Sequence, residues 1–311
     1  DVITRSVKAK NLNSEKIKLT KILSMSLDFE GIDYDMISLN GSWARERYIN
    51  RRKVTYGTQS IGSVRGESSS QDSPFIALLD SGANDEYGEV YGFNFVYSGN
   101  FISMVQGCQG NTTRVLMGIN PSDFEWVLET GDEFVAPEVV MVHSSKGIGE
   151  MTRTFHDLYR NHLLRGKYKD KKRPILINNW EATYFDFDTN KLLDIAREAA
   201  KCGIEMLVMD DGWFGKRNSD NCSLGDWIVN EDKLKGGLKY LVDEVNKLGL
   251  EFGIWMEPEM VSLDSDLYRN HPDWCIHIEG RTPALARNQY VLDLTRKEVA
   301  NYVYESIKKV L

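Results

Sequence analysis

Apolar residues alternate with polar or small ones along the first half of the chain, with the period of two that is typical of strands. The clearest case is Tyr91–Tyr97, where an aromatic residue occupies every second position. Leu23–Leu27 and Val115–Ile119 alternate in the same way, and breaks rich in glycine and asparagine separate such segments. Many short strands divided by turn signals predict an antiparallel β-sandwich, which we place at residues 1–150.

One segment of this region, Ser42–Lys53, is rich in arginine. Charged side chains are typical of sheet edges, because they oppose pairing with a further strand. We therefore expect this segment to be an edge strand or a loop whose charges are solvated.

The period of the apolar residues becomes helical after the predicted sandwich. Met151 and Phe155 fall on one helical face, and a run rich in lysine and arginine follows. We predict that residues 151–173 form a helical linker. His156 and His162 are expected to be surface or packed residues, because their spacing of six does not place them on one face of a helix.

Strand and helix patterns alternate from Pro174 onward. Apolar runs of strand length are separated by amphipathic stripes, and Thr295–Glu298 fits a capping box that opens a last helix. The successive segments are a strand at 175–180, a helix from 189, a strand at 204–209, a helix at 238–248 and a strand at 250–256. Strands joined by helices without hairpin signals predict a parallel sheet. Tyr290–Leu294 is either a fourth strand or an excursion before the last helix.

The predicted fold class is therefore multidomain β and α/β, with an antiparallel β-sandwich followed by an incomplete (β/α)8 TIM-type barrel at residues 174–311. A closed barrel of this type needs eight strands, and the sequence provides three or four. The first residue is Asp1 rather than methionine. We expect the chain to be part of a longer polypeptide at both ends.

Composition and charge narrow the functional class. A hydrophobic content of 41% and a charged content of 27% are ordinary for a soluble globular protein. The formal net charge of −8 argues against a nucleic-acid partner, and the sequence contains no apolar run long enough to span a bilayer. The four cysteines show no metal-ligand spacing, and their scatter along the chain favours reduced thiols and a cytoplasmic location over a disulfide framework.

The candidate chemistry lies where the predicted parallel strands end. Asp210 and Asp211 follow the strand at 204–209, while Trp180 and Trp255 end the neighbouring strands. In a β/α barrel these strand ends form the catalytic face. Carboxylates accept hydrogen bonds from hydroxyls and an indole stacks on an apolar ring face, so this combination indicates a sugar ligand. For an isolated Asp-Asp-Gly, the alternative is that one aspartate caps a turn and the other is solvated.

Further aromatic and acidic residues belong to the same predicted face. Trp213 and Phe214 open a long segment that runs to Gly237 and also contains Asp226 and Trp227. We expect this segment to help shape a substrate pocket. Two adjacent carboxylates tend to diverge, whereas retaining glycosidases need carboxyls about 5–5.5 Å apart across the scissile bond. The aspartate pair is therefore interpreted as binding hydroxyls, with the catalytic pair elsewhere.

The sequence resembles glycoside hydrolase family 36, the microbial α-galactosidases. The matching strings occur in order along the chain. In the barrel region they are Asn179-Trp-Glu-Ala-Thr-Tyr-Phe185, Asp210-Asp-Gly-Trp-Phe214, Gly225-Asp-Trp227, Trp255-Met-Glu-Pro-Glu-Met-Val261, His271-Pro-Asp-Trp274 and Leu292-Asp-Leu-Thr-Arg296. In the sandwich region Leu39–Arg47, Gly88–Gly92 and Phe155–Arg160 are similar to the family's recurring strings.

The resemblance implies a retaining hydrolase that removes terminal α-linked galactose from melibiose- or raffinose-type oligosaccharides, without a metal or redox cofactor. Asp210 and Asp211 would bind the O4 and O6 hydroxyls of galactose. Trp180 and Trp255 would line the pocket, and Arg287 would bond sugar hydroxyls or orient the nucleophile. The family also implies a homo-oligomer.

The family's two catalytic aspartates are absent from this sequence. The nucleophile belongs to a Lys-Trp-Asp string on the strand expected just after Leu311, and the acid/base comes later still. The resemblance gives Glu257 and Glu259 only supporting roles, so we expect no catalytic residue in this chain and no activity from it alone. The alternatives are a galactosyl-transferring relative of the raffinose-synthase type and a non-catalytic carbohydrate-binding scaffold.

Overall fold

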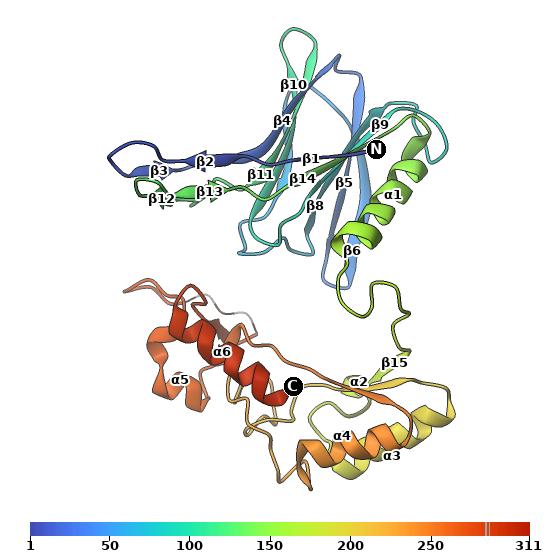
Figure 1. Cartoon of the computed structure of the whole chain (residues 1–311), viewed down its shortest axis with the longest axis vertical. Helices are drawn as coiled ribbons and strands as arrows, with labels where there is room; N and C mark the ends of the chain where they lie inside the picture. The colour runs from blue at the N-terminus through green and yellow to red at the C-terminus, as the bar shows by residue number, and fades with distance from the viewer. Residues whose placement is uncertain (284, 286) are drawn as a thin grey trace. The chain divides into compact units, whose positions relative to one another are not determined.

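The chain divides into two compact units, Asp1–Asp170 and Lys171–Leu311, which are described separately. Figure 1 shows the computed structural model, which describes residues 1–283, 285 and 287–311. Strands make up most of the first unit, whereas the second contains a small parallel sheet with helices (Figure 1).

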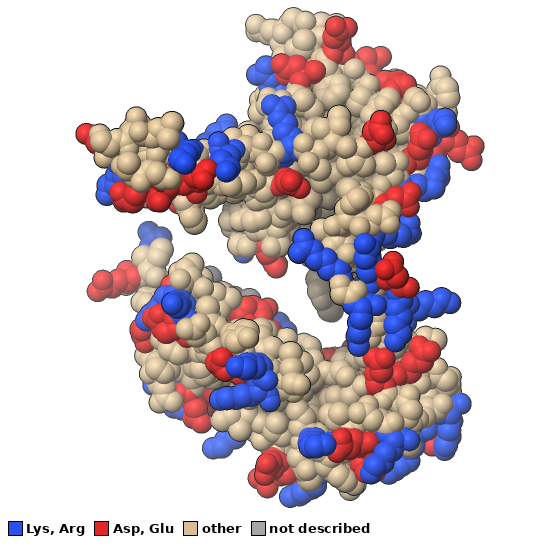
Figure 2. All heavy atoms as spheres, viewed as in Figure 1, with Lys and Arg blue, Asp and Glu red and all other residues tan. Residues whose placement is uncertain are grey.

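No helix among the described residues is long and apolar enough to cross a membrane. Figure 2 shows acidic and basic side chains interspersed over most of the face that it draws.

The first unit is a β-sandwich, as predicted. Its larger sheet has six antiparallel strands in the order β1-β14-β9-β8-β5-β6, and its smaller sheet has the order β10-β11-β4. The strands of the larger sheet are Val2–Arg5 (β1), Val139–Ser144 (β14), Val90–Phe95 (β9), Asp72–Asp80 (β8), Tyr34–Ser42 (β5) and Arg45–Lys53 (β6). Those of the smaller sheet are Phe101–Cys108 (β10), Thr112–Ile119 (β11) and Leu23–Glu30 (β4), and Gly57–Gly62 (β7) packs against β10.

Two short ribbons complete the strands of this unit. Trp126–Leu128 (β12) pairs with Ile17–Leu19 (β3), and Glu133–Val135 (β13) pairs with Lys8–Lys10 (β2). Both pairings are antiparallel. Every strand pairing of the first unit that the register describes is therefore antiparallel, as the short alternating segments indicated.

The inner strands of the six-stranded sheet carry buried side chains on both faces. Ile76 and Leu78 of β8 belong to the core shared with the smaller sheet, while Ala77 and Leu79 belong to a second core on the opposite face. This division follows from the alternation of side chains along a strand. The second core is completed by the helix Gly147–Leu158 (α1).

The helix α1 packs on the sandwich instead of standing apart from it. Met151 and Phe155 are 3% and 4% exposed and contact the outer face of the sheet. A Cβ atom on Gly92 of β9 would lie 2.5 Å from the Sδ of Met151, so glycine permits this close approach. The helical part of the predicted linker thus belongs to the first unit. It continues as a π-helix over Tyr159–Leu163, and His156 and His162 are both exposed.

The arginine-rich segment forms β6, which lies at the edge of the six-stranded sheet and is largely exposed, as expected. Arg51 differs from that expectation, because its guanidinium is bonded to protein atoms. Its Nε donates to Oδ2 of Asp35 at 2.7 Å, and its Nη1 donates to the carbonyl of Ala83 at 2.6 Å. Its Nη2 donates to the carbonyls of Asp80 and Ser81. Arg51 therefore ties the edge strand to the loop after β8.

The second unit contains the predicted β/α pattern. Three parallel strands, Leu176–Asn178 (β15), Met206–Met209 (β16) and Glu251–Ile254 (β17), pair in the order β15-β16-β17. The helices Trp180–Thr183 (α2) and Thr189–Lys201 (α3) connect the first two strands, and Gly237–Lys247 (α4) precedes the third. Gly203 and Gly249 follow α3 and α4 with positive φ of 78° and 83°, as expected of residues that end helices.

The rest of this unit resolves the alternative that the sequence left open for Tyr290–Leu294. Met260–Ser262 (β18) pairs antiparallel with Gln289–Val291 (β19), so Tyr290 belongs to an excursion and not to a fourth parallel strand. Asp266–Asn270 (α5), the 3-10 helix Pro272–Trp274 and Lys297–Val310 (α6) are the remaining helices of the described residues.

The predicted capping box at the start of α6 is wrong. The N-cap residue is Arg296, and no side chain caps the helix there. The hydroxyl of Thr295 instead donates to Oδ1 of Asp293 at 2.5 Å. Because this local bond satisfies the hydroxyl, the helix begins two residues after Thr295.

Replacing Phe155 by alanine tests the packing of α1. Its ring contacts that of Phe75 at a centroid distance of 5.8 Å, and it is almost fully buried. We expect Phe155→Ala to lower the free energy of unfolding of the first unit by about 3–5 kcal/mol, because it leaves a cavity between helix and sheet. Scanning calorimetry and urea unfolding of the chain measure this change. The neighbouring exposed residue offers the control His156→Ala, expected within about 0.5 kcal/mol of wild type. Equal effects of the two variants would show that α1 is not part of the sandwich core.

Candidate functional site

The predicted polar residues meet at one edge of the parallel sheet. Asn178 of β15 is in register with Val208 of β16, and Met209 of β16 with Ile254 of β17. Since the three strands are parallel, their carboxyl ends lie at the same edge. The backbone N–H of Trp255 donates to the carbonyl of Met209 at 2.9 Å, which extends this alignment one residue past the strand. Trp180, Asp210 and Trp255 therefore follow neighbouring strand ends.

Asp210 is partly exposed and is held by two asparagines. Its Oδ2 accepts a hydrogen bond from Nδ2 of Asn178 at 2.5 Å, and its backbone N–H donates to Oδ1 of Asn179 at 2.8 Å. Asn179 is fully buried and also donates to the hydroxyl of Thr183. The Oδ1 of Asp210 accepts from the backbone N–H of Asp211 at 2.7 Å. The carboxylate is thus oriented by β15 and by its own backbone, with its side chain at the sheet edge.

Asp211 is almost completely buried, in an ion pair with Arg217. The Nε of Arg217 lies 2.9 Å from Oδ1 and 3.1 Å from Oδ2 of the carboxylate, and its Nη2 lies 2.7 Å from Oδ2. The side chains of Arg217 and Asp211 are 0% and 3% exposed. Asp210 and Asp211 therefore have different partners, consistent with the expected divergence of consecutive side chains. Arg217 was not predicted from the sequence.

A second cation, Lys233, joins the loops behind the aspartates. Its Nζ donates to the carbonyl of Phe185 at 2.8 Å and to that of Gly212 at 3.0 Å, and it lies 4.6 Å from the ring centroid of Phe187. Burial lowers the pKa of Lys233, and the nearby charge of Asp211 opposes this effect. Lys233 links the loop after β15 to the residue that follows Asp211. It too was missed, because its segment has no periodic pattern.

The aromatic residues at the strand ends divide into buried and partly exposed groups. Trp213 and Phe214 are both 0% exposed, so these two rings do not take part in shaping a pocket. They fill the core beneath the loop, and the indole N–H of Trp213 donates to the carbonyl of Trp255 at 2.9 Å. Trp255 is partly exposed and packs against the ring of Phe214 at a centroid distance of 6.5 Å. The buried rings therefore support Trp255 from behind.

Trp180 remains partly exposed at the first strand end. Its ring meets those of Tyr184 and Phe185 edge-on, at centroid distances of 5.3 and 5.0 Å. Its backbone N–H donates to Oδ1 of Asn178, the residue that also bonds Asp210. Trp180 and Asp210 thus share one hydrogen-bonding partner.

Arg287 lies close to the acidic residues after β17. Its Nη1 is 3.3 Å from Oε2 of Glu257, whose side chain is 13% exposed against 55% for Arg287. Burial raises the pKa of Glu257, while the positive charge of Arg287 opposes the rise. Arg287 and Asn288 both have positive φ, of 53° and 61°, a backbone conformation that is costly for residues other than glycine and often found at functional sites. Glu259 is exposed.

The expectation that Asp226 and Trp227 help to form a pocket is not supported by their surroundings. The two carboxylate oxygens of Asp226 accept from the backbone N–H groups of Asp266 and Leu267, at the start of α5. Burial raises the pKa of Asp226. Trp227 is 6% exposed and belongs to the core. Both residues hold the long loop in place.

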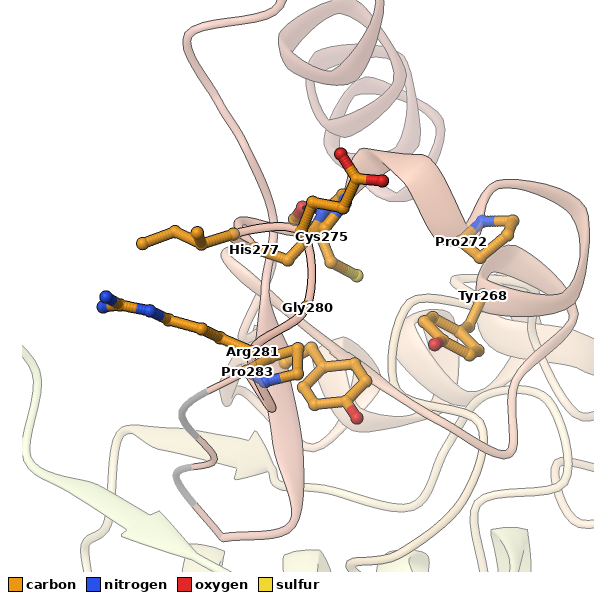
Figure 3. A pocket seen from close by; sticks show the side chains of 10 residues that line it. Tyr268, Pro272, Cys275, His277, Gly280, Arg281 and Pro283 are labelled. Carbon is orange, nitrogen blue, oxygen red and sulfur yellow. Dashed lines mark hydrogen bonds between the residues drawn. The ribbon is translucent and has the colours of Figure 1, made fainter.

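A cavity of about 350 Å³ in the second unit is formed by other residues. Figure 3 shows Tyr268 and Pro272 on one side of it and the segment with His277 and Gly280 on the other. Its described lining contains none of the five residues that the sequence predicted to bind substrate. The buried thiol of Cys275 lines it, and burial raises the pKa of that thiol to about 11. The cavity therefore does not coincide with the strand-end cluster.

The cluster at the strand ends offers the chemistry of a hydroxyl-binding site. Asp210 presents a partly exposed carboxylate, and Trp180 and Trp255 present partly exposed indoles. Such acceptors and ring faces match the hydroxyls and apolar face of a sugar. Among the described residues, no group of three or more histidine, cysteine, aspartate or glutamate side chains is placed to hold a metal ion.

Comparison with known proteins gives matches along the entire chain. The profile of the Melibiase family matches residues 133–311, and that of the Glycosyl hydrolase family 36 N-terminal domain matches residues 1–129. Alpha-galactosidase AgaA of Geobacillus stearothermophilus is 55% identical over 311 residues, which are 100% of this chain and 43% of AgaA. The bifunctional alpha-galactosidase/sucrose kinase AgaSK of Mediterraneibacter gnavus is 48% identical over all of this chain and 33% of its own length.

Solved structures agree with the sequence matches. The crystal structure of AgaA superimposes on 100% of this chain and 43% of its own, with a TM-score of 0.98. Structures of AgaA variants are described in complex with stachyose and with raffinose. The chain thus spans less than half the length of these relatives.

The raised pKa of Glu257 predicts a pH-dependent effect of removing its charge. Because its pKa is higher in the folded state, the ionised carboxylate opposes folding above that pKa, and this cost disappears below the unfolded value of about 4.3. Glu257→Gln should therefore unfold at higher urea concentration than wild type at pH 7, with the difference shrinking toward pH 4. Urea unfolding of both proteins at each pH measures it. An equal difference at pH 4 and pH 7 would contradict the assigned direction.

Proposed function

The chain belongs to glycosyl hydrolase family 36, and from this premise we propose that the protein containing it is a retaining α-galactosidase. Its substrates are proposed to be melibiose- or raffinose-type oligosaccharides with a terminal α-D-galactosyl residue. The complexes of AgaA variants with stachyose and raffinose support this substrate class. The observation that carries the proposal is the alignment of Trp180, Asp210 and Trp255 at the ends of three parallel strands.

Each residue of the cluster has a proposed part in binding galactose. Asp210 and Asp211 accept hydrogen bonds from the O4 and O6 hydroxyls, and Trp180 and Trp255 line the pocket. Arg287, placed by Glu257, donates to hydroxyls or orients the nucleophile. Asp210 is the better exposed of the two aspartates, whereas Asp211 reaches a ligand only through the small exposed part of its side chain.

This arrangement supports a preference for galactose over glucose. The two sugars differ in the configuration at C4, so an acceptor placed for the axial O4 of galactose is left unpaired by glucose. A buried acceptor without a partner is costly, and sites built around one hydroxyl discriminate strongly against ligands that lack it.

We propose that the bond-breaking carboxylates are supplied outside these 311 residues. The relatives extend well beyond the matched region, since AgaA is matched over only 43% of its length. Glu257 is paired with Arg287, which supports a role in positioning and not in nucleophilic attack.

The location and assembly of the protein are also proposals. All four cysteines, Cys108, Cys202, Cys222 and Cys275, are free thiols, which supports a cytoplasmic location. The edge strand β6 and the turn before it expose large apolar side chains, including Trp43 at 86% and Ile49 at 74%. Exposed apolar surface beside an unpaired strand edge supports self-association into a homo-oligomer.

The enzymatic proposal is tested with a chromogenic α-galactoside. The protein expressed from its whole coding sequence is expected to hydrolyse it, and the 311-residue chain is not. Turnover by the 311-residue chain would place the catalytic carboxylates within it and overturn that part of the proposal. Galactosyl transfer without hydrolysis by the whole protein would indicate a transferase, and binding without turnover a scaffold.

Replacing Asp210 by asparagine tests the proposed binding role. In the whole protein, Asp210→Asn should lower kcat/KM for α-galactosides by about 100-fold or more, because it replaces a charged acceptor for a sugar hydroxyl. Steady-state kinetics give this ratio, and circular dichroism shows whether the fold is kept. Asp194→Asn removes an exposed carboxylate of α3 and serves as the matched control with unchanged kinetics. Near-normal kinetics of Asp210→Asn would mean that this aspartate is structural only.

A further inference from the structure

We propose that Arg217 is a positioning residue that sets the sugar selectivity of the site by fixing the carboxylate of Asp211. This inference rests on the proposed function and extends it to a residue that does not itself end a strand. Arg217 lies six residues after Asp211, in the loop between β16 and α4. It acts on the ligand through Asp211, so it is not proposed as a catalytic residue.

The geometry of the ion pair leaves the carboxylate little freedom. One edge of the Arg217 guanidinium, formed by Nε and Nη2, faces both oxygens of Asp211 at distances of 2.7 to 3.1 Å. Two-pronged pairing of this kind fixes the plane of a carboxylate as well as its position. Because one side of each oxygen is engaged, the lone pairs left for a ligand point in fixed directions.

The guanidinium is itself held from several sides. Its Nη1 donates to the carbonyl of Cys222 at 2.9 Å, and its Cζ lies 5.8 Å and 6.0 Å from the ring centroids of Phe185 and Phe214. The side chain is fully buried, so water cannot replace these partners. Arg217 is therefore a rigid support and not a mobile surface cation.

The backbone between the two residues is folded to allow this contact. Gly212 has a φ of 106°, and a Cβ atom on it would lie 3.0 Å from a ring carbon of Phe185 and 3.4 Å from the carbonyl oxygen of Arg217. The Nζ of Lys233 donates to the carbonyl of Gly212 at 3.0 Å. The positive φ of Gly212 lets the loop turn back toward Asp211, and the hydrogen bond from Lys233 to the Gly212 carbonyl stabilises this turn.

A fixed carboxylate discriminates between epimers better than a mobile one. A carboxylate free to rotate can follow a hydroxyl that is displaced from axial to equatorial, whereas one held along an edge cannot. The displaced hydroxyl then loses its hydrogen bond to the buried carboxylate, which is where selectivity arises. If Arg217 only stabilised the fold, its removal would change stability without changing the ratio of activities toward the two epimers.

The experiment compares kcat/KM for an α-galactoside and the matching α-glucoside in the whole protein. The variants are Arg217→Lys, Arg217→Gln, Asp211→Asn and the double variant Asp211→Asn/Arg217→Gln. We expect the ratio of kcat/KM for the galactoside to that for the glucoside to fall by about 10-fold or more in Arg217→Lys. Lysine keeps the positive charge but lacks the two neighbouring N–H donors that the guanidinium directs at the carboxylate. The ratio should fall further in Arg217→Gln, so that lysine gives partial rescue.

The double variant tests whether Arg217 acts through Asp211. Removing one partner leaves a buried charge unpaired and can prevent folding, whereas removing both charges avoids this cost. The double variant should therefore fold, with the same ratio as Asp211→Asn. A double variant with a clearly lower ratio than Asp211→Asn would overturn the inference, as would a folded Arg217→Lys with the wild-type ratio.

A matched control separates selectivity from stability. Arg51 is an arginine of the first unit whose guanidinium is also bonded to a carboxylate and to carbonyls. Arg51→Lys should lower the melting temperature and leave the galactoside-to-glucoside ratio unchanged. A wild-type protein without preference for the galactoside would refute the proposed function itself, whereas a preference that survives in Arg217→Lys would refute only the role of Arg217.

Discussion

A β-strand made only of apolar residues can present polar side chains only where it ends, and this constraint places the strand-end aspartates of the second unit. β16 is apolar throughout Met206–Met209, and Asp210 follows it at once. Because β15 and β17 run parallel to β16, the residues that end them reach the same edge. The side chains that donate to the two carboxylates, among them Asn178 and Arg217, come from the neighbouring strand and from the loop after β16.

Much of this organisation could be predicted from the sequence, because it depends on periodicity. Alternation with a period of two identified the sandwich, and the change to strands divided by helical stripes identified the parallel sheet. The same signal cannot tell which way an aromatic side chain points at a strand end. Trp213 and Trp255 both sit beside acidic residues in the sequence, yet only Trp255 keeps exposed surface. Trp213 packs in the core beneath the loop, where its ring fills space between neighbouring side chains.

The residues that sequence reasoning missed belong to loops, where no period exists. A chain reversal at Gly212 brings Arg217 to Asp211, and Lys233 donates to the carbonyl of that glycine. A reversal of this kind depends on tertiary packing. The sequence did contain one signal for this pairing, because Gly212 directly follows the two aspartates and Arg217 lies five residues further on. The capping prediction failed for a similar reason, since the hydroxyl of Thr295 found a nearer partner in Asp293.

The tryptophans of the two units differ in exposure, and the wavelength of their fluorescence should differ accordingly. The first unit contains two of the seven, Trp43 and Trp126, which are 86% and 50% exposed. In the second unit Trp213, Trp227 and Trp274 are all buried. Indole emission moves to longer wavelength in water, so the blue component of the native spectrum comes from the three buried indoles of the second unit, whereas the exposed Trp43 and Trp126 and the partly exposed Trp180 and Trp255 emit further to the red. Loss of the blue component alone would report that the second unit has opened while the sandwich remains folded.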